Sequence, residues 1–259
     1  ARSTSKLGDI MSEDVISVDV NADQEVVADQ VDRYDFIAIP VTDPNGRLLG
    51  AVTFDDILDV VENEATEDIY KMAGSSAEEE ESESILHIAR FRLPWLLVCL
   101  AGTQLSTLVL TYAQGKVGLY EQMSVFTAAI MAMAGNTSLQ SSTTTVRRLA
   151  LDNLPRGRFV RHVAREISVA LLMGVICGLV AASLAIAFGN DPIIGLALGS
   201  AMAMGMSAAS LLGAAMPLAL DLVGIDPAVS SGPLVSTIND SLALALYFAV
   251  ATGILFVSG

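Results

Sequence analysis

The chain has 259 residues, 53% of them hydrophobic, with 29 acidic and 14 basic side chains and a formal net charge of −15 at pH 7. This apolar fraction is too high for an ordinary soluble domain, and the acidic balance argues against a nucleic-acid-binding protein. The charge is divided unevenly, because residues 1–84 hold 22 acidic and five basic residues whereas residues 85–259 hold seven and nine. An acidic module, for which cations are the expected partners, therefore precedes an apolar one.

The chain starts at Ala1 with neither a methionine nor a signal peptide, so we expect an upstream portion of the protein to be missing. Cys99 and Cys177 lie in apolar runs and are interpreted as small hydrophobic residues, neither a disulfide nor a metal pair. The sequence shows no nucleophile–base pair and no histidine cluster, since His87 and His162 are single residues at the ends of apolar segments. We therefore expect a protein that is not an enzyme.

The acidic module has the pattern of a small α/β domain. Its predicted elements are, in order, a strand at Val15–Asp19, a helix at Asp23–Asp35, a buried strand at Phe36–Val41, a strand at Arg47–Thr53 and a helix from Asp55 to Lys71. The turn residues Pro44-Asn45-Gly46 join the last two strands into a hairpin.

Three short motifs in this module resemble a CBS domain over residues 9–60. They are Ile39-Pro40-Val41, Arg47-Leu48-Leu49-Gly50 and Thr53-x-x-Asp56. CBS domains usually work in pairs, so the resemblance implies a second copy upstream or in another chain. It also implies ATP as a candidate cofactor, with Asp56 at the ribose position.

The two helices of this module carry many carboxylates. On the second helix Asp56, Asp59, Glu64, Glu67 and Asp68 crowd together at three- and four-residue spacing, where like charges repel. On the first helix the corresponding group is Asp23, Glu25, Asp32 and Asp35. One interpretation is a solvated acidic face, and the other is a set of Mg²⁺ or Ca²⁺ sites, since these ions prefer clustered oxygen ligands.

Glu78 to Glu83 form an acidic block that we interpret as a mobile linker. The predicted divisions are a CBS domain at 1–61, a connecting helix and linker at 62–84, and a membrane domain at 85–259.

Five apolar segments follow, each close to the ~20 residues that a membrane helix requires. They are Leu93–Tyr112, Met123–Thr145, Ile167–Phe188, Ile193–Met216 and Pro233–Val257. The sequence therefore predicts a mixed fold, a small α/β domain followed by an all-α membrane domain of five transmembrane helices.

Basic residues predict the orientation of these helices in the plasma membrane. They gather before the first segment and between the second and third, at Arg90, Arg92, Arg147, Arg148, Arg156, Arg158, Arg161 and Arg165. Because basic loops stay in the cytoplasm, we expect the acidic module inside and the C-terminus outside.

The second segment is unusually polar. Ala128, Ala132, Asn136 and Gln140 recur every four residues and so share one face of a helix. The face could be polar packing between helices or the lining of a hydrated pathway, and both interpretations stay open.

The last segment contains a single carboxylate, Asp240, with Ser236 and Thr237 one turn before it. A charge inside a membrane needs a partner, a proton or water. Asp240 is therefore either a structural aspartate paired in the bundle or a cation-binding group on a permeation path. Asp226 is either a helix cap or an ion site at the cytoplasmic mouth, and Glu121 is a candidate for the outer mouth.

These residues together resemble the MgtE family of magnesium channels and transporters over nearly the whole chain. The matching motifs are Glu64-Ala65-Thr66-Glu67-Asp68, Arg92-Leu93-Pro94-Trp95-Leu96, Ala134-Gly135-Asn136-Thr137-x-x-Gln140, Arg147-Arg148, Asp226-Pro227-Ala228 and Ser236-Thr237-x-x-Asp240. The family's N-terminal helical domain and first CBS copy have no counterpart here.

The resemblance implies a homodimer whose pore lies on the dimer axis and is lined by the second and fifth membrane helices. It implies a pore ion site at Asp240, with Asn136 and Thr237 nearby, and a separate site at Asp226. It assigns regulatory Mg²⁺ sites to Asp23, Glu25, Asp35, Asp56, Asp59, Glu64, Glu67 and Asp68. Residues from about Glu62 to Gly74 would then form or lead into a helix that plugs the pore.

We therefore expect a Mg²⁺ channel or transporter that closes when Mg²⁺ binds its acidic cytoplasmic module. Two alternatives remain open: a divalent cation exchanger coupled to Na⁺ or H⁺, and a nucleotide-sensing CBS protein with a membrane anchor. The expected partners are a second copy of the chain, membrane lipid and divalent cations. The preference among Mg²⁺, Mn²⁺, Co²⁺ and Ca²⁺ stays open.

Overall fold

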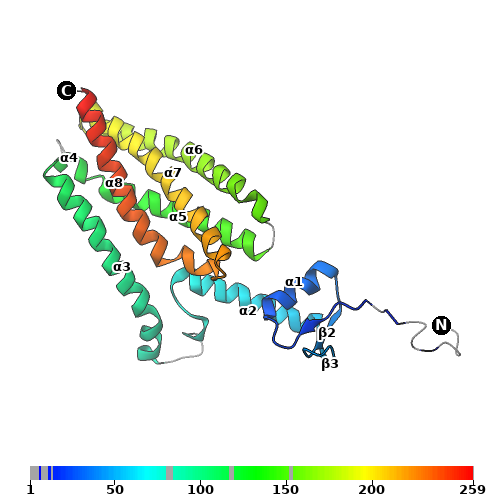
Figure 1. Cartoon of the computed structure of the whole chain (residues 1–259). Coiled ribbons are helices and arrows are strands. Elements are labelled where there is room, and N and C mark those ends of the chain that lie inside the picture. Colours follow the sequence, from blue (N-terminus) through cyan, green and yellow to red (C-terminus); the bar gives the residue numbers. More distant parts are fainter. Residues whose placement is uncertain are drawn as a thin grey trace. The chain divides into compact units, whose positions relative to one another are not determined.

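The computed structural model describes Lys6, Met11, Ser12 and residues 14–79, 84–116, 120–151 and 154–258. Residues 80–83 of the predicted linker lie outside this part of the chain. The chain forms two compact units, residues 1–67 and residues 68–259 (Figure 1).

The first unit is a small α/β domain with a three-stranded sheet in the order β1-β2-β3. Its elements are β1 (Val18–Asp19), α1 (Gln24–Tyr34), β2 (Ala38–Thr42), β3 (Leu48–Thr53) and α2 (Phe54–Ala73), the last of which continues into the second unit. β1 pairs in parallel with β2, and β2 pairs antiparallel with β3 through the predicted hairpin. The order of elements agrees with the sequence prediction.

The strands are shorter or more exposed than the sequence suggests. β1 contains two residues instead of the predicted five. β2 was predicted to be buried, but Ile39 is its one fully buried residue. Ile39 packs with Val27, Val31 and Ile57 in a small core between the sheet and the two helices.

The second unit is a bundle of long helices. Its elements are η2 (Ala77–Glu79), α3 (Ile85–Gln114), α4 (Tyr120–Ser124), α5 (Thr127–Ala150), η3 (Arg156–Arg158), α6 (Phe159–Ala187), α7 (Pro192–Leu222), η4 (Pro227–Ser231) and α8 (Pro233–Ser258). α3, α6 and α7 extend beyond the predicted apolar segments, because hydropathy marks the apolar part of a helix and not its polar ends. The segment predicted at Met123–Thr145 is divided, since α4 ends at Ser124 and α5 begins at Thr127.

α7 lies at the centre of this bundle and contacts α5, α6 and α8. Small residues allow the close approach: a Cβ on Gly178 of α6 would lie 2.4 Å from the Gly199 carbonyl oxygen of α7. A Cβ on Gly213 of α7 would lie 2.3 Å from the Ser138 carbonyl oxygen of α5. Pro217 lies inside α7, which continues to Leu222.

α3 is attached differently. Its main packing partner among the long helices is α8, beside which it runs in Figure 1. Most of its apolar side chains are exposed in a single chain, including Leu96, Leu100 and Leu108 at 60–65%.

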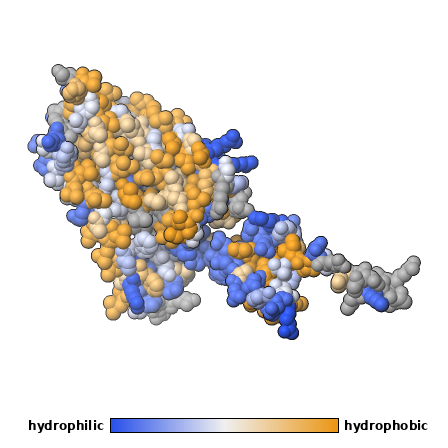
Figure 2. Space-filling model, in the orientation of Figure 1, coloured by the Kyte–Doolittle hydropathy of each residue, from blue (hydrophilic) through white to orange (hydrophobic). Residues whose placement is uncertain are grey.

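The surface of the helical unit is largely apolar, as Figure 2 shows for one face. Within the described residues, α3, α6, α7 and the Val235–Val257 part of α8 are long and apolar enough to cross a membrane. The protein is therefore a multi-pass membrane protein. α5 has the length of a span but is too polar to qualify by composition, because its second half is rich in Ser, Thr and amide side chains.

Candidate ion-binding site

Asp240 lies in the first half of α8 and is half-buried in the single chain. Its immediate neighbours along the helix are the polar residues Asn239 and Ser241. α5 packs against α8, and it presents Ala132, Asn136 and Gln140 on an exposed face. The predicted polar face of α5 is thus on the surface of the subunit and is not consumed by packing inside it.

The buried faces of the same two helices hold them in place. Tyr247 of α8 is fully buried and donates a hydrogen bond of 2.9 Å to the Met123 carbonyl oxygen, just before α5. Phe248 stacks on Tyr120 with the ring centroids 5.4 Å apart. On α5, Ser141 bonds Ser210 of α7 at 2.7 Å and Thr145 bonds His162 of α6 at 2.8 Å. These contacts fix which face of α5 remains free.

His162, expected at the end of an apolar segment, lies in the first turn of α6 and is 4% exposed. The face of Ala128, Ala132, Asn136 and Gln140 on α5 had two possible roles, packing between helices and lining of a pathway. In the structure Asn136 and Gln140 are exposed, whereas Ser141 and Thr145 make the packing contacts.

Thr237, a predicted pore residue, is 7% exposed and faces Gly102 of α3. Glu121 is exposed on the short helix α4.

Asp226 does two things in the structure. One carboxylate oxygen accepts a hydrogen bond of 2.8 Å from the Ala228 amide, so it caps η4 as the Asp-Pro sequence predicts. The other carboxylate oxygen lies 2.7 Å from Nζ of Lys71, near the end of α2. Gly232 adds a close backbone approach there, because a Cβ on it would lie 3.0 Å from the Met72 carbonyl oxygen. The end of α2 is therefore bound to the segment that leads into α8.

Four of the eight predicted regulatory carboxylates, Asp23, Glu25, Asp35 and Asp56, lie at helix ends. Asp23 caps the start of α1 by accepting from the Glu25 amide at 3.0 Å, and Asp35 forms its left-handed end with φ 51°. Asp56 accepts from the Thr53 hydroxyl at 2.6 Å and from the Thr53 amide at 3.2 Å. These two hydrogen bonds, the hydroxyl's first, lower the pKa of Asp56.

The remaining predicted regulatory carboxylates lie along α2. Glu64 accepts a hydrogen bond of 2.6 Å from Gln24 of α1, while Asp59 is exposed and Glu67 and Asp68 are half-buried. In the part of the chain that the structure describes, no three His, Cys, Asp or Glu side chains converge on one point.

Glu79 was missed by the sequence reasoning, which grouped it with the acidic linker. It is 5% exposed, and its carboxylate oxygen lies 2.7 Å from Nε and 2.6 Å from an Nη atom of Arg92. It also accepts a hydrogen bond from Ser75. These bonds, with Arg92 first, lower the pKa of Glu79 below its usual range. The pair binds η2 to the start of α3.

Asn239 was also missed. It is 1% exposed, and neither amide atom has a hydrogen-bond partner within the described part of the chain. A buried amide without a partner is costly, so this side chain is an exception to ordinary packing. Its position directly before Asp240 is the signal that sequence reasoning could have used.

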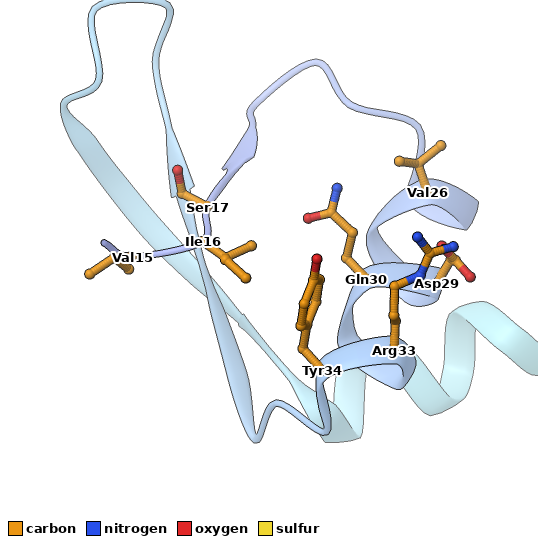
Figure 3. Close-up of a pocket in the computed structure, with 8 residues that line it drawn as sticks. All are labelled: Val15, Ile16, Ser17, Val26, Asp29, Gln30, Arg33 and Tyr34. Carbon is orange, nitrogen blue, oxygen red and sulfur yellow. The ribbon is translucent and has the colours of Figure 1, made fainter. Parts of the chain in front are cut away.

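The first unit contains an open hollow of about 510 Å³ between α1 and the segment before β1. Figure 3 shows Gln30 and Tyr34 of α1 on the side toward Ile16 and Ser17, with Arg33 and Asp29 at its edge. Arg33 and Asp29 are 3.2 Å apart as an ion pair. Asp56, the residue expected to bind a ribose, does not line this hollow.

Comparisons with known proteins agree with this arrangement of an α/β unit and a helical unit. Residues 127–250 match the family described as MgtE, divalent cation transporter, and residues 7–63 match the CBS domain. The chain is 38% identical over 247 residues to "Magnesium transporter MgtE" of Enterococcus faecalis, covering 95% of this chain and 54% of that protein. It is 34% identical over 247 residues to "Magnesium transporter MgtE" of Bacillus subtilis, covering 95% and 55%.

A third relative, "Magnesium transporter MgtE" of Thermus thermophilus, is 32% identical over 250 residues, covering 95% and 55%. A solved structure described as "Crystal structure of the soluble part of a magnesium transporter" is 58% identical over 22% of each chain, with a TM-score of 0.22. The chain spans about half the length of the curated relatives that it matches. It contains a CBS domain and the helical domain of one family, and thus belongs to the MgtE family.

Proposed function

We propose that this protein conducts Mg²⁺ across the plasma membrane through a pore on the axis of a homodimer. The observation that carries the proposal is the exposed polar face of α5, with Asn136 and Gln140, on a helix that packs against the one bearing Asp240. Amide side chains facing lipid would be unfavourable, so this face requires another polar surface. The corresponding face of a second copy is such a surface, and the relatives named as magnesium transporters support the choice of ion.

Two-fold symmetry would place two Asp240 carboxylates near one axis. Two like charges in a medium of low dielectric constant repel, and one divalent cation neutralises both. A site with two negative charges therefore favours a divalent over a monovalent ion.

Mg²⁺ loses its water reluctantly, so the proposed pore binds a hydrated ion through its water ligands. Asp240 accepts hydrogen bonds from these waters, and Asn136 supplies an amide oxygen as a further acceptor. Thr237 contributes to the packing of α8 at this level. When its hydroxyl turns toward the pore, it also supplies a further oxygen. Asp226 and Glu121 are the proposed ion-attracting carboxylates of the inner and outer mouths.

Regulation follows from the charge of the first unit. Residues 1–84 carry 22 acidic and five basic side chains, so apposed copies repel unless cations lie between them. Because the acidic residues of one subunit do not converge, we propose that regulatory Mg²⁺ bridges carboxylates of different domains or subunits. Bound Mg²⁺ favours the compact state, in which the end of α2 holds the segment before α8, and the pore is closed.

The experiment is Mg²⁺ flux into liposomes that contain the purified protein, compared with Asp240→Asn. The substitution removes the charge but preserves the size of the side chain. We expect a fall of about 100-fold or more, the factor that corresponds to a loss of ~3 kcal/mol of ion stabilisation. A matched control is Asp221→Asn in α7, which removes one charge elsewhere and leaves the flux unchanged. Undiminished flux in Asp240→Asn would contradict the proposal.

Two further arms of the same assay test the coupling and the regulation. Flux that needs a Na⁺ or H⁺ gradient would indicate an exchanger, whereas flux that depends on the Mg²⁺ gradient alone supports a channel. Raising Mg²⁺ on the side of the first unit lowers the flux if the acidic unit closes the pore. ATP binding without any ion flux would instead indicate a nucleotide sensor with a membrane anchor.

A further inference from the structure

We propose that Gly102 and Ser106 of α3 are positioning residues for Asp240, because they set the distance and the rotation of α8 at the turn that carries this carboxylate. The inference rests on the proposed function of Asp240 and adds a role for α3, which lies outside the expected pore-lining pair of helices. We call the contact of Gly102 and Ser106 with Thr237 and Ser241 the α3–α8 seam.

The closest approach in the seam is at Gly102. A Cβ there would lie 1.6 Å from the Thr237 Cγ2 methyl, 3.0 Å from its Cβ and 3.5 Å from its hydroxyl oxygen. No side chain can be accommodated at the first of these distances, so α3 and α8 can lie this close only because residue 102 is a glycine. Thr237 is 7% exposed, and this contact is part of its burial.

The second contact of the seam lies one turn further along both helices. Ser106 is 6% exposed, and its hydroxyl oxygen is 3.0 Å from that of Ser241. Gly102 and Ser106 are four residues apart on α3, as Thr237 and Ser241 are on α8. Two contacts one turn apart fix the rotation of α8 about its own axis as well as its distance from α3.

Asp240 lies between the two contacts along α8, three residues after Thr237 and one before Ser241. A rotation of α8 at the seam therefore moves this carboxylate directly. For a group ~6 Å from the helix axis, a rotation of about 20° gives a displacement of about 2 Å. A displacement of that size matters for an ion site, since misplacement by ~1 Å can reduce a rate by about 100-fold.

The packing of α3 allows its role in positioning Asp240 to be distinguished from a general contribution to stability. The centre of the bundle is α7 with α5, α6 and α8, and α3 packs mainly against α8. A change in the seam should therefore leave the packing of α7 with α5 and α6 intact while shifting the turn of Asp240.

The test is Gly102→Ala, with Mg²⁺ flux measured over a range of Mg²⁺ concentrations. We expect flux to fall by about tenfold or more, together with a change in the half-saturating Mg²⁺ concentration and in the ratio of Mg²⁺ to Ca²⁺ flux, because the ion site itself is displaced. The double variant Gly102→Ala/Thr237→Ser removes the Cγ2 methyl that the new Cβ would strike and keeps the hydroxyl. We expect it to recover the flux and ion preference of Thr237→Ser alone.

The control is Gly253→Ala, which adds the same methyl to α8 at a position with no atom within 4 Å and leaves both readouts unchanged. If Gly102→Ala cannot be purified as a folded protein, Ser106→Ala provides the test. This variant adds no volume, and we expect it to shift the ion preference because it removes the hydroxyl that contacts Ser241. Normal flux and ion preference in Gly102→Ala, failure of Thr237→Ser to restore them, or a neutral Ser106→Ala would each overturn the proposal. If Asp240→Asn conducts normally, the proposed function fails; if only the seam variants are neutral, only this inference fails.

Discussion

Asp226 shows how one carboxylate can serve two structural purposes at once. It caps η4 with one oxygen and pairs with Lys71 of α2 through the other. The cap could be predicted, because Asp before Pro is a common start of a helical turn. The pair with Lys71 could not, since the two residues are 155 positions apart and nothing in either local sequence identifies the partner.

Glu79 leads to a prediction on stability and pH. Its bonds to Arg92 and Ser75 favour the ionised form, so its pKa is lower in the folded protein than the usual 4.5. The pair therefore stabilises the fold above that value and loses its effect as pH falls through the lowered pKa. Glu79→Gln should melt at a lower temperature than the wild type at pH 7, and the difference should shrink well below pH 4.5.

The measurement is thermal unfolding of the detergent-solubilised protein at neutral and acidic pH. Glu78→Gln is the matched control, because the neighbouring side chain is exposed. An equal melting temperature for the wild type and Glu79→Gln at pH 7 would show that the pair contributes nothing.

At the scale of elements, the crossing of α5 and α7 leads to the next prediction. A methyl group on Gly213 would meet the Ser138 carbonyl oxygen at 2.3 Å, and backbone atoms cannot move aside as a flexible side chain can. We expect Gly213→Ala to lower the free energy of unfolding by about 1–3 kcal/mol, the usual range for overpacking.

Gly205→Ala is the control within the same helix, where an added Cβ has no atom within 4 Å. It should be neutral or stabilising by up to about 1 kcal/mol, because alanine favours a helix more than glycine does. Chemical unfolding of both variants in the same detergent gives the comparison. Equal stabilities would mean that α5 and α7 can separate at no cost.

The elements were largely predictable from sequence, for reasons that also explain the errors. Apolar length identified the long helices, and the hairpin turn identified β2 and β3. Pro217 does not end α7, because a membrane helix tolerates proline when other groups satisfy the backbone carbonyl one turn earlier, which has no N–H donor from the proline. For α5 the pattern of Ala132, Asn136 and Gln140 predicted the polar face, but only packing shows that this face is free.

At the scale of the whole molecule, the proposed dimer predicts a cross-link. In a background without Cys99 and Cys177, Asn136→Cys should form a covalent dimer with a bifunctional thiol-reactive reagent in membranes. A disulfide requires the two Cβ atoms to be about 3.5–4.5 Å apart, which is too close for a pore that holds a hydrated ion, so a spacer between the two thiols is needed.

Leu179→Cys in α6 is the control, since this side chain is 65% exposed on a helix that the proposal places against lipid. It should remain monomeric under the same conditions. Cross-linking at Leu179 but not at Asn136 would mean that a different face joins the subunits.

The site was less predictable than the fold. Sequence alone drew attention to Asp240 because a carboxylate in an apolar run is conspicuous, and to Asn136 because of its periodic neighbours. It gave no indication that Thr237 is covered by Gly102, since a close approach between helices that are distant in sequence depends on their relative rotation. Contacts of this kind are set by the whole bundle.

The attachment of α3 also constrains the order in which the protein can be built. The ribosome makes α3 first among the membrane helices and α8 last, and the Ser106–Ser241 contact joins residues 135 positions apart. At ~5–20 residues per second, roughly 7 to 27 seconds of synthesis separate the two halves of this contact. During that time α3 is in contact with lipid or with the insertion machinery, and it can dock only after α8 has been made.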